Sequence, residues 1–285
     1  MKYLVTGTSG QLGYDVVREL EKRGFNNIFK ATLENMDLTK EEQVKEVIKN
    51  EFPAVVIHCA AYTNVDGAEE DIDNCMLINA TATKWIAETC KEIGTKLIYI
   101  STDYVFDGSK DGIYESSDKK HPLNVYGKSK SVGEDYALLN PKTFVVRTSW
   151  VYGINGKNFV KTMLRLASIK TELSVVCDQI GSPTYTKDLA RLLVDMSKTN
   201  KYGIYHATNE GFCSWYEFAK KIFELTNTNI LLNSIPTDEY PQKAKRPKNS
   251  RLSKDSLVKN GFEKLPNWED SLKLYLEELH NSDNH

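Results

Sequence analysis

The chain has 285 residues, with 37 lysines and arginines against 39 aspartates and glutamates, and a formal net charge of −2. This length suffices for one large domain, or for a medium domain with a smaller one, without disulfides or metals to stabilise it. Because the basic residues form no continuous stripe, the sequence lacks the electrostatic pattern of nucleic-acid binding, and we expect no nucleic-acid partner.

The cysteines, the histidines and the N-terminus indicate a cytoplasmic protein without a metal site. The five cysteines are widely spread and include no C-x-x-C pair, which argues against a disulfide framework or a zinc site. The histidines lack metal-ligand spacing, and His58 is expected to be a core residue at a strand end. The stretch MKYLVTGTSG does not resemble a signal peptide, and no window of about 18–20 residues is continuously apolar, so we expect no membrane contact.

Short apolar runs alternate with longer helical patterns through the first half of the chain. The runs cover residues 3–6, 27–32, 54–60, 96–101 and 143–149, and the helical patterns cover 11–23, 40–51, 73–93 and 126–139. Such alternation predicts βαβ units with helices on both faces of a parallel sheet. We therefore predict the α/β class, with a Rossmann-type doubly wound parallel sheet forming a dinucleotide-binding domain over residues 1–150.

Beyond residue 150 the pattern becomes irregular. Loop-rich stretches separate helical patterns near 157–169, 186–198, 214–226 and 268–280. We expect residues 151–285 to form a smaller C-terminal region that packs tightly on the first domain and lies across the open edge of its sheet, with some chain returning to that sheet. Two capping boxes predict helix starts, one at Thr39 with Glu42 and one at Ser214 with Glu217.

The segment VTGTSGQLG joins the first predicted strand to the first helix and carries Gly7, Gly10 and Gly13 at G-x-x-G-x-x-G spacing. In a dinucleotide-binding turn, Gly7 permits the sharp bend, Gly10 lets a pyrophosphate approach the backbone, and Gly13 lets the helix pack close to the strand. The alternative is a glycine-rich loop without a ligand. The position after the first of five alternating strands favours the dinucleotide-binding turn.

The adenosine end of the cofactor site is less well defined. The acid that normally binds the ribose diol of NAD about 20 residues after the turn is missing, since the second strand ends with Lys30, Thr32 and the displaced Glu34. The sequence thus leaves NADH and NADPH both open. Asp37 and Leu38 either flank the adenine or belong to a helix-capping loop.

A proton-transfer site is predicted where the run over 96–101 ends and the helix over 126–139 begins. Thr102 follows the run, at the carboxyl edge of the sheet, where open α/β folds bind ligands. Tyr126 and Lys130 are four residues apart and share one helix face, whereas Lys128 is expected to face solvent. A nearby ammonium lowers the pKa of a phenol, so the pair fits a proton donor beside a nicotinamide. The alternative is ordinary packing of a lysine stem on a ring.

Further motifs extend along nearly the whole chain. They are AAYTNVDGAE, LINA, STDYVFDG, PLNVYGKSK, RTSWVYG, NFVKTMLRLA, DQIGSPT and RPKNSRL, together with GTSGQLG at the start. The chain thereby resembles the extended short-chain dehydrogenase/reductase family, and most closely its dTDP-4-dehydrorhamnose reductases. The resemblance implies that NADPH or NADH reduces the C4 ketone of dTDP-4-dehydro-L-rhamnose, giving dTDP-L-rhamnose for cell-surface polysaccharide synthesis.

The resemblance also implies roles for individual residues. Tyr126 would protonate the C4 keto oxygen, and Thr102 would assist at the same oxygen. Lys130 would tune the acidity of Tyr126 and bind the nicotinamide ribose. The implied sugar-binding positions are Thr102, Asp103 and Trp150. The implied cofactor positions are Gly10, Gln11 and Leu12 at the pyrophosphate, and Ala60, Ala61, Tyr62 and Thr63 alongside it, with Tyr62 standing where the family usually has histidine.

Some implied roles have structural alternatives. Asn79 corresponds to an asparagine that helps to position the lysine, or it caps a helix kink. Arg246, Asn249 and Arg251 either reach a substrate diphosphate, whose geometry suits guanidinium groups, or form an exposed basic loop. The family also implies a homodimer. The remaining alternatives for the whole protein are another nucleotide-sugar epimerase, dehydratase or reductase of the same fold, and a non-catalytic cofactor-binding regulatory subunit.

Overall fold

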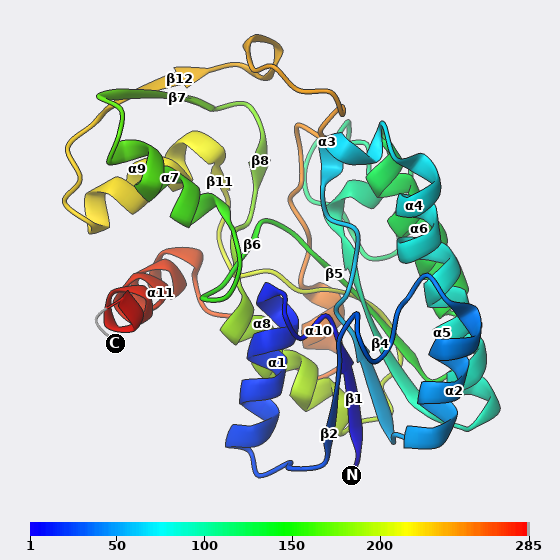
Figure 1. Ribbon diagram of the computed structural model, residues 1–285. Coiled ribbons are helices and arrows are strands. Elements are labelled where there is room, and N and C mark those ends of the chain that lie inside the picture. Colours follow the sequence, from blue (N-terminus) through cyan, green and yellow to red (C-terminus); the bar gives the residue numbers. More distant parts are fainter. Residues whose placement is uncertain (284–285) are drawn as a thin grey trace.

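A six-stranded parallel sheet lies at the centre of the larger lobe in the computed structural model, which describes residues 1–283 (Figure 1). Its strands, in spatial order, are β10 (Gly203–His206), β5 (Thr143–Thr148), β4 (Lys96–Thr102), β3 (Val55–His58), β1 (Tyr3–Thr6) and β2 (Ile28–Ala31). Strands β1, β3 and β5 are buried along their whole length, as expected for a parallel sheet covered on both faces. The predicted α/β fold is confirmed.

Helices cover both faces of this sheet (Figure 1). On one face α1 (Gln11–Lys22) packs against α8 (Thr186–Ser197), and on the other lie α2 (Glu41–Glu51), α5 (Ala82–Glu92) and α6 (Val125–Ala137). The apolar residues of α1 recur at Leu12, Val16 and Leu20, which places them on one buried stripe toward the sheet.

The helical pattern predicted over residues 73–93 is interrupted in the structure. A short helix α4 (Ile72–Met76) runs into a π-helical turn (Leu77–Thr81) before α5 begins, and α3 (Val65–Ala68) precedes them. Asn79 lies in the π-helical turn, and π-helical turns within helices are frequent at functional sites.

Residues beyond 150 contribute to both lobes. The strand β10 extends the central sheet, and α8 and α10 (Asp255–Lys259) pack on the same lobe. The smaller lobe has its own core, which includes Tyr152, Phe218 and Trp268. Its elements are β6 (Val151–Tyr152), α7 (Phe159–Ala167), β7 (Glu172–Val176), β8 (Ile180–Gly181), β9 (Thr184–Tyr185), β11 (Cys213–Ser214), α9 (Trp215–Leu225), β12 (Leu231–Ile235) and α11 (Trp268–Asp283). Residues 284–285, at the end of the predicted second region, lie outside the described residues.

The two predicted capping boxes have different outcomes. At α9 the Ser214 hydroxyl accepts from the Glu217 N–H, and the Glu217 carboxylate accepts from the Ser214 N–H, which confirms that box. The prediction of a capping box at Thr39 is wrong, because the Thr39 hydroxyl donates to Asp37 and Lys40 is the residue that precedes α2. The Asp37 carboxylate competes successfully for the hydroxyl at this short sequence distance.

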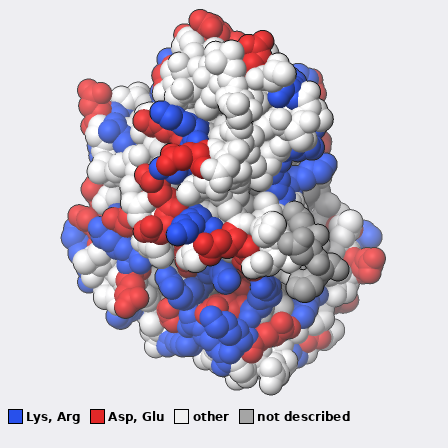
Figure 2. Space-filling model, turned by 90° about the vertical axis from the view of Figure 1, so that its left-hand side faces the viewer, with Lys and Arg blue, Asp and Glu red and all other residues white. Residues whose placement is uncertain are grey.

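Charged side chains are mixed on the face turned toward the viewer in Figure 2. Lysines and arginines gather in its lower part, interspersed with acids, and the upper part carries fewer charges. Elsewhere in the fold, an ion pair between Arg18 and Glu278 joins α1 and α11 over 2.9 Å. Within residues 1–283, no helix is long and apolar enough to cross a membrane.

Candidate active site

A cavity of about 890 Å³ opens at the carboxyl edge of the central sheet, where β1, β3, β4 and β5 end. It brings together most of the predicted site residues. Those that line it are Gly7, Gly10, Gln11, Leu12, Asp37, Leu38, Ala60, Ala61, Thr63, Thr102, Asp103, Tyr126, Lys130 and Trp150. Gly13, Tyr62, Arg246, Asn249 and Arg251 do not line it.

The glycine turn is shaped to hold a phosphate-containing group. Gly7 has φ +69°, and a Cβ there would stand 2.7 Å from the Ala60 nitrogen. A Cβ on Gly13 would stand 2.2 Å from the Gly7 carbonyl oxygen, which explains why this glycine lies beneath the turn and not in the cavity. The turn leads directly into the N-terminus of α1, whose free N–H groups favour an anion. These residues therefore fit the pyrophosphate of a dinucleotide.

A loop from beyond residue 150 holds this turn from the other side, which the sequence did not reveal. The side-chain oxygen of Gln11 accepts from Gly153 N over 3.0 Å and from Asn158 Nδ2 over 3.1 Å. Asn155 Nδ2 donates to the Ser9 carbonyl over 2.8 Å. A sequence signal existed only for Asn158, whose side chain caps α7 by accepting from Lys161 N.

The start of α6 is fixed so that Tyr126 faces the end of β4. Asn124 caps the helix by accepting from Gly127 N over 2.7 Å, and Glu69 accepts from Val125 N over 2.8 Å. A Cβ on Gly127 would lie 2.2 Å from the Tyr104 carbonyl oxygen, so only glycine allows this close approach. A glycine within a helical pattern is the sequence signal for such packing.

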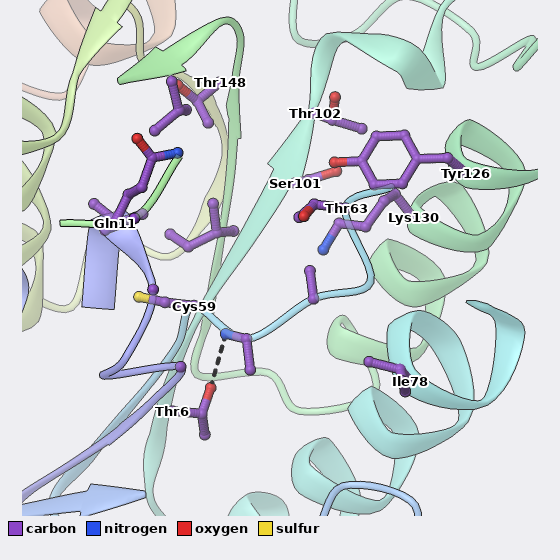
Figure 3. Close-up of a pocket in the computed structure, with 18 of the residues that line it drawn as sticks. Thr6, Gln11, Cys59, Thr63, Ile78, Ser101, Thr102, Tyr126, Lys130 and Thr148 are labelled. Atoms are coloured by element: carbon purple, nitrogen blue, oxygen red, sulfur yellow. Dashed lines mark hydrogen bonds between the residues drawn. The ribbon is translucent and has the colours of Figure 1, made fainter. Parts of the chain in front are cut away.

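Tyr126 extends from α6 toward the side chains at the end of β4, as Figure 3 shows. Desolvation raises the pKa of its phenol, and Asp103 adds to the rise, against the lowering effect of a hydrogen bond with the Thr102 side chain. The expectation that Lys130 lowers this pKa is wrong for the net shift, because burial dominates. The phenol therefore retains its proton at neutral pH, as a proton donor requires.

The hydroxyl of Thr102 is held by the next residue. It donates to Asp103 Oδ1 over 2.9 Å and accepts from Tyr104 N over 3.2 Å. Burial raises the pKa of Asp103 to about 6, so this carboxylate is mostly ionised at neutral pH. Thr102 thus presents its hydroxyl to the cavity in a defined orientation.

Lys130 is 3% exposed, and its ammonium lies over the ring of Tyr99, 4.2 Å from the ring centre. Desolvation lowers its pKa to about 7, although Glu134, the next largest influence, raises it. Lys128 on the same helix is exposed, as predicted.

Asn79 connects three segments around Lys130. Its side chain accepts from Tyr62 N over 2.8 Å, donates to the Tyr62 carbonyl over 3.0 Å, and donates to Ser129 Oγ over 2.9 Å. Tyr62 thus meets the site through its backbone, which explains why the side chain there can differ from histidine. His58 is buried between the hydroxyls of Thr6 and Thr83, and the expectation that it is a core residue is confirmed.

The predicted adenosine end lies beside β2. Asp37 lines the cavity, and its carboxylate also accepts from the N–H and hydroxyl of Thr39, which lowers its pKa. Lys30 bonds to Glu21 over 2.8 Å and does not line the cavity, whereas Thr32 does.

Two stacked tryptophans form the wall toward the smaller lobe. Trp150 has φ +49°, a left-handed backbone conformation that is strained for a bulky residue. Its ring stacks on Trp215 with the ring centres 3.7 Å apart and an interplanar angle of 14°. Trp215, absent from the sequence prediction, lines this cavity and a second cavity of about 1080 Å³.

The predicted diphosphate residues lie near the second cavity or are engaged with their own chain. Arg246 lines the second cavity and donates to Asp66 over 2.8 Å. Asn249 donates to two backbone carbonyls, each over 2.7 Å, and accepts from the Arg251 guanidinium over 2.9 Å. Their contacts with a substrate stay a prediction.

Comparisons with known proteins identify the family of the chain. Residues 1–281 match the family model described as RmlD substrate binding domain. The chain is 41% identical to the spore coat polysaccharide biosynthesis protein SpsK of Bacillus subtilis, covering 97% of each chain. It is also 41% identical to dTDP-4-dehydrorhamnose reductase of Aggregatibacter actinomycetemcomitans, covering 95% of this chain and 97% of that protein.

A solved structure gives the same result in three dimensions. The dTDP-4-dehydrorhamnose reductase of Bacillus anthracis, determined in complex with NADP, superposes with a TM-score of 0.94 at 43% identity, covering 98% of this chain and all of that one. The family resemblance predicted from the sequence motifs is thereby confirmed. This chain, in which the glycine turn, Tyr126 and Lys130 meet in one cavity, therefore belongs to the dTDP-4-dehydrorhamnose reductase family.

Proposed function

We propose that this protein reduces the C4 ketone of dTDP-4-dehydro-L-rhamnose to the alcohol of dTDP-L-rhamnose, with hydride from NADPH or NADH. The observation that carries the proposal is the single cavity in which the glycine turn, Thr102, Tyr126, Lys130 and Trp150 converge. Membership of the family supports the substrate, and the NADP complex of the Bacillus anthracis relative supports the type of cofactor.

The cofactor site is proposed along the turn and the loop after β3. Gly7, Gly10 and Leu12 would hold the pyrophosphate, and Ala60 and Ala61 would lie alongside. The hydroxyl of Thr148 is buried at this cavity without a hydrogen-bond partner, which suits a polar group of a bound molecule. When bound, the reduced nicotinamide supplies the hydride that this chain lacks.

The chain's own residues would complete the reduction by moving one proton. Tyr126 would give its hydroxyl proton to the carbonyl oxygen and be left as phenolate, while the hydride from the nicotinamide would bond to C4, so that a C–H and an O–H bond replace the π bond of the carbonyl and the C–O single bond remains. Thr102 donates a hydrogen bond to the same oxygen when its proton turns away from Asp103. Lys130 stabilises the phenolate that remains and binds the nicotinamide ribose through its ammonium.

The remaining expectations on partners and organisation are part of the proposal. Residues 151–285 would supply most of the substrate contacts, with Arg246, Asn249 and Arg251 near the diphosphate, and Trp150 at the end of the first region would add to them. The protein would act as a cytoplasmic homodimer, without nucleic acid. Size-exclusion chromatography with light scattering tests the dimer.

The test of the activity is oxidation of NADPH or NADH, followed by nicotinamide absorbance, in the presence of dTDP-4-dehydro-L-rhamnose. Consumption of reduced nicotinamide with appearance of dTDP-L-rhamnose is expected. No turnover with either nucleotide would contradict the proposal and favour a regulatory subunit. Release of an epimerised or dehydrated sugar without net oxidation of the nicotinamide would favour another nucleotide-sugar enzyme.

A further inference from the structure

Glu134 and Arg147 form a buried ion pair behind the strand ends that line the cavity. Glu134 lies on α6, four residues after Lys130, and Arg147 lies on β5, next to Thr148. Arg147 donates through Nε and Nη2 to the two carboxylate oxygens of Glu134, each over 2.8 Å. The two side chains are 2% and 1% exposed, so water does not screen the pair.

The pair also joins the neighbouring strands. Ser101 Oγ on β4 donates to Glu134 Oε1 over 2.6 Å. Arg147 Nη1 donates to the Ser116 carbonyl over 3.1 Å and to His206 Nε2 on β10 over 3.3 Å. His206 accepts because burial lowers the pKa of its ring to about 3 and keeps it neutral. One ion pair thus links α6 with β4, β5 and β10.

Stability alone does not account for this arrangement. Two charges lose their hydration when they are buried, and replacing such a pair by apolar residues is often neutral or stabilising. The pair lies where it affects the reaction, because the residue after Ser101 is Thr102 and the residue four before Glu134 is Lys130. The position of the ion pair indicates that it orients the reacting groups.

We propose that Glu134, held by Arg147, is a positioning residue that fixes α6 against β4, so that Tyr126 and Lys130 face Thr102, and that its carboxylate, one turn from Lys130 on the same helix, favours the ammonium form of that lysine. This inference rests on the proposed reduction. Glu134 is the largest influence that opposes the desolvation of Lys130. The other titratable groups around Lys130 are His58 and Cys59 at the end of β3, Cys75 on α4, Tyr99 on β4 and Tyr126 on α6 itself. The Lys120 ammonium lies 3.5 Å from Glu134 Oε2 and also faces the pair.

The first test is Glu134→Gln, with Asp135→Asn as the control. Asp135 is the next residue on α6, but its side chain is 65% exposed. In Glu134→Gln we expect kcat to fall about 10- to 100-fold with little change in KM, because the reacting groups lose their alignment. The pKa of Lys130 falls without the carboxylate, so the alkaline limb of the kcat/KM profile moves down by about one pH unit. Asp135→Asn should match the wild type in kcat and in the position of the alkaline limb.

A second variant separates positioning from folding. The double variant Glu134→Met with Arg147→Met removes both charges at similar volume, and it is expected to fold with an unchanged or raised Tm. Its kcat should nevertheless fall, and its alkaline limb should move to lower pH. A folded double variant with wild-type kcat and an unchanged pH profile would overturn the proposal.

Two further outcomes remain decisive. If neither Glu134 variant folds, Ser101→Ala removes only the hydroxyl that links the pair to β4, and wild-type kcat and pH profile in that variant overturn the proposal. If the wild type itself shows no turnover, the proposed function fails separately. The ion pair is then judged by NADPH fluorescence, where Glu134→Gln should bind NADPH more weakly than the wild type between about pH 6 and pH 7, because Lys130 has lost its charge there in the variant but not in the wild type. Equal NADPH affinity of Glu134→Gln and the wild type at every pH would overturn the proposal.

Discussion

The Lys130 ammonium lies 4.2 Å from the centre of the Tyr99 ring, buried against β4. Tyr126, one turn earlier on the same helix, is withdrawn from water, and this desolvation raises the pKa of its phenol. The pKa values of the lysine and the tyrosine are therefore shifted in opposite directions for the same reason, since burial disfavours the charged form of each. At neutral pH the phenol holds its proton, while the ammonium is close to losing one of its own.

Tyr126→Phe should abolish most of the activity without affecting the fold. The ring keeps its edge contact with Tyr104, whose centre lies 5.6 Å away, and only the transferred proton is lost. We expect kcat to fall about 10²- to 10⁴-fold with NADPH affinity unchanged. Tyr136→Phe, on the same helix but outside the cavity, is the matched control and should retain full turnover. A full rate in Tyr126→Phe would remove this residue from the mechanism.

The pH profile of kcat/KM should fall on the alkaline side as Lys130 loses its proton. The pKa of this lysine is lowered to about 7 in the free protein, and kcat/KM reports groups of the free enzyme. In Lys130→Met we expect this limb to disappear and kcat/KM to drop about 10²-fold. Lys128→Met, with its side chain in solvent, should leave the profile unchanged. A limb near pH 7 that persists in Lys130→Met would assign it to another group.

Lys130→Met should also raise stability, which separates function from folding. A lysine whose folded pKa lies below its unfolded value disfavours the native state most at low pH, and this cost disappears as pH rises from about 7 to about 10.5. The gain in Tm should therefore be larger near neutral pH than near about pH 10. Thermal unfolding followed by circular dichroism measures this difference. Unfolding of the variant would instead indicate a structural role.

Asp103→Asn should stabilise the protein at neutral pH while impairing catalysis. Burial raises the pKa of Asp103 to about 6, so the native state binds a proton more tightly than the unfolded chain, and stability falls as pH rises through about 4 to 6. The neutral amide avoids this cost, and we expect a gain of about 2 kcal/mol near neutral pH that vanishes near pH 4. Denaturant unfolding at both pH values checks this. An equal effect at both would show that the carboxylate does not titrate as described.

Alanine at two glycines of the turn should separate fold from cofactor binding. A Cβ on Gly13 would clash with the Gly7 carbonyl oxygen at 2.2 Å, whereas on Gly10 it would lie at 3.2 Å from the same atom and point to the ligand side. Gly13→Ala should therefore lose about 1–3 kcal/mol of stability. Gly10→Ala should lose much less stability but bind NADPH more weakly, as measured by fluorescence titration. The reverse ranking would show that the turn does not hold the pyrophosphate.

Trp215→Leu tests the stacked wall between the two cavities. Trp215 lies flat on Trp150 and borders both cavities, so its loss removes a large aromatic surface that the cavities offer to a ligand. We expect KM for the sugar nucleotide to rise about tenfold, with NADPH affinity unchanged. Trp85→Leu, on α5 and outside both cavities, is the control for loss of an indole. A rise in KM for NADPH alone would move the stacked pair to the cofactor side.

Local patterns in the sequence were enough to predict the elements and the main parts of the site. Apolar runs that alternate with helical periods predict a parallel sheet, and glycines at 7, 10 and 13 predict the phosphate-binding turn, because each signal lies within about one βα unit. The four-residue spacing of Tyr126 and Lys130 likewise places them on one face of a helix. These features depend on neighbours in the chain.

Tertiary structure alone decided which residues act on one another across long sequence distances. The sequence led us to expect some returning chain, but not that β10 is the strand that joins the central sheet beside β5. The support of Gln11 by Asn158 and the Glu134–Arg147 pair behind the site likewise join residues far apart in the chain. The direction of the pKa shift at Tyr126 also escaped prediction. A pKa depends on the total burial and field at one atom, and the sequence shows the lysine nearby but not the desolvation of the phenol that outweighs it.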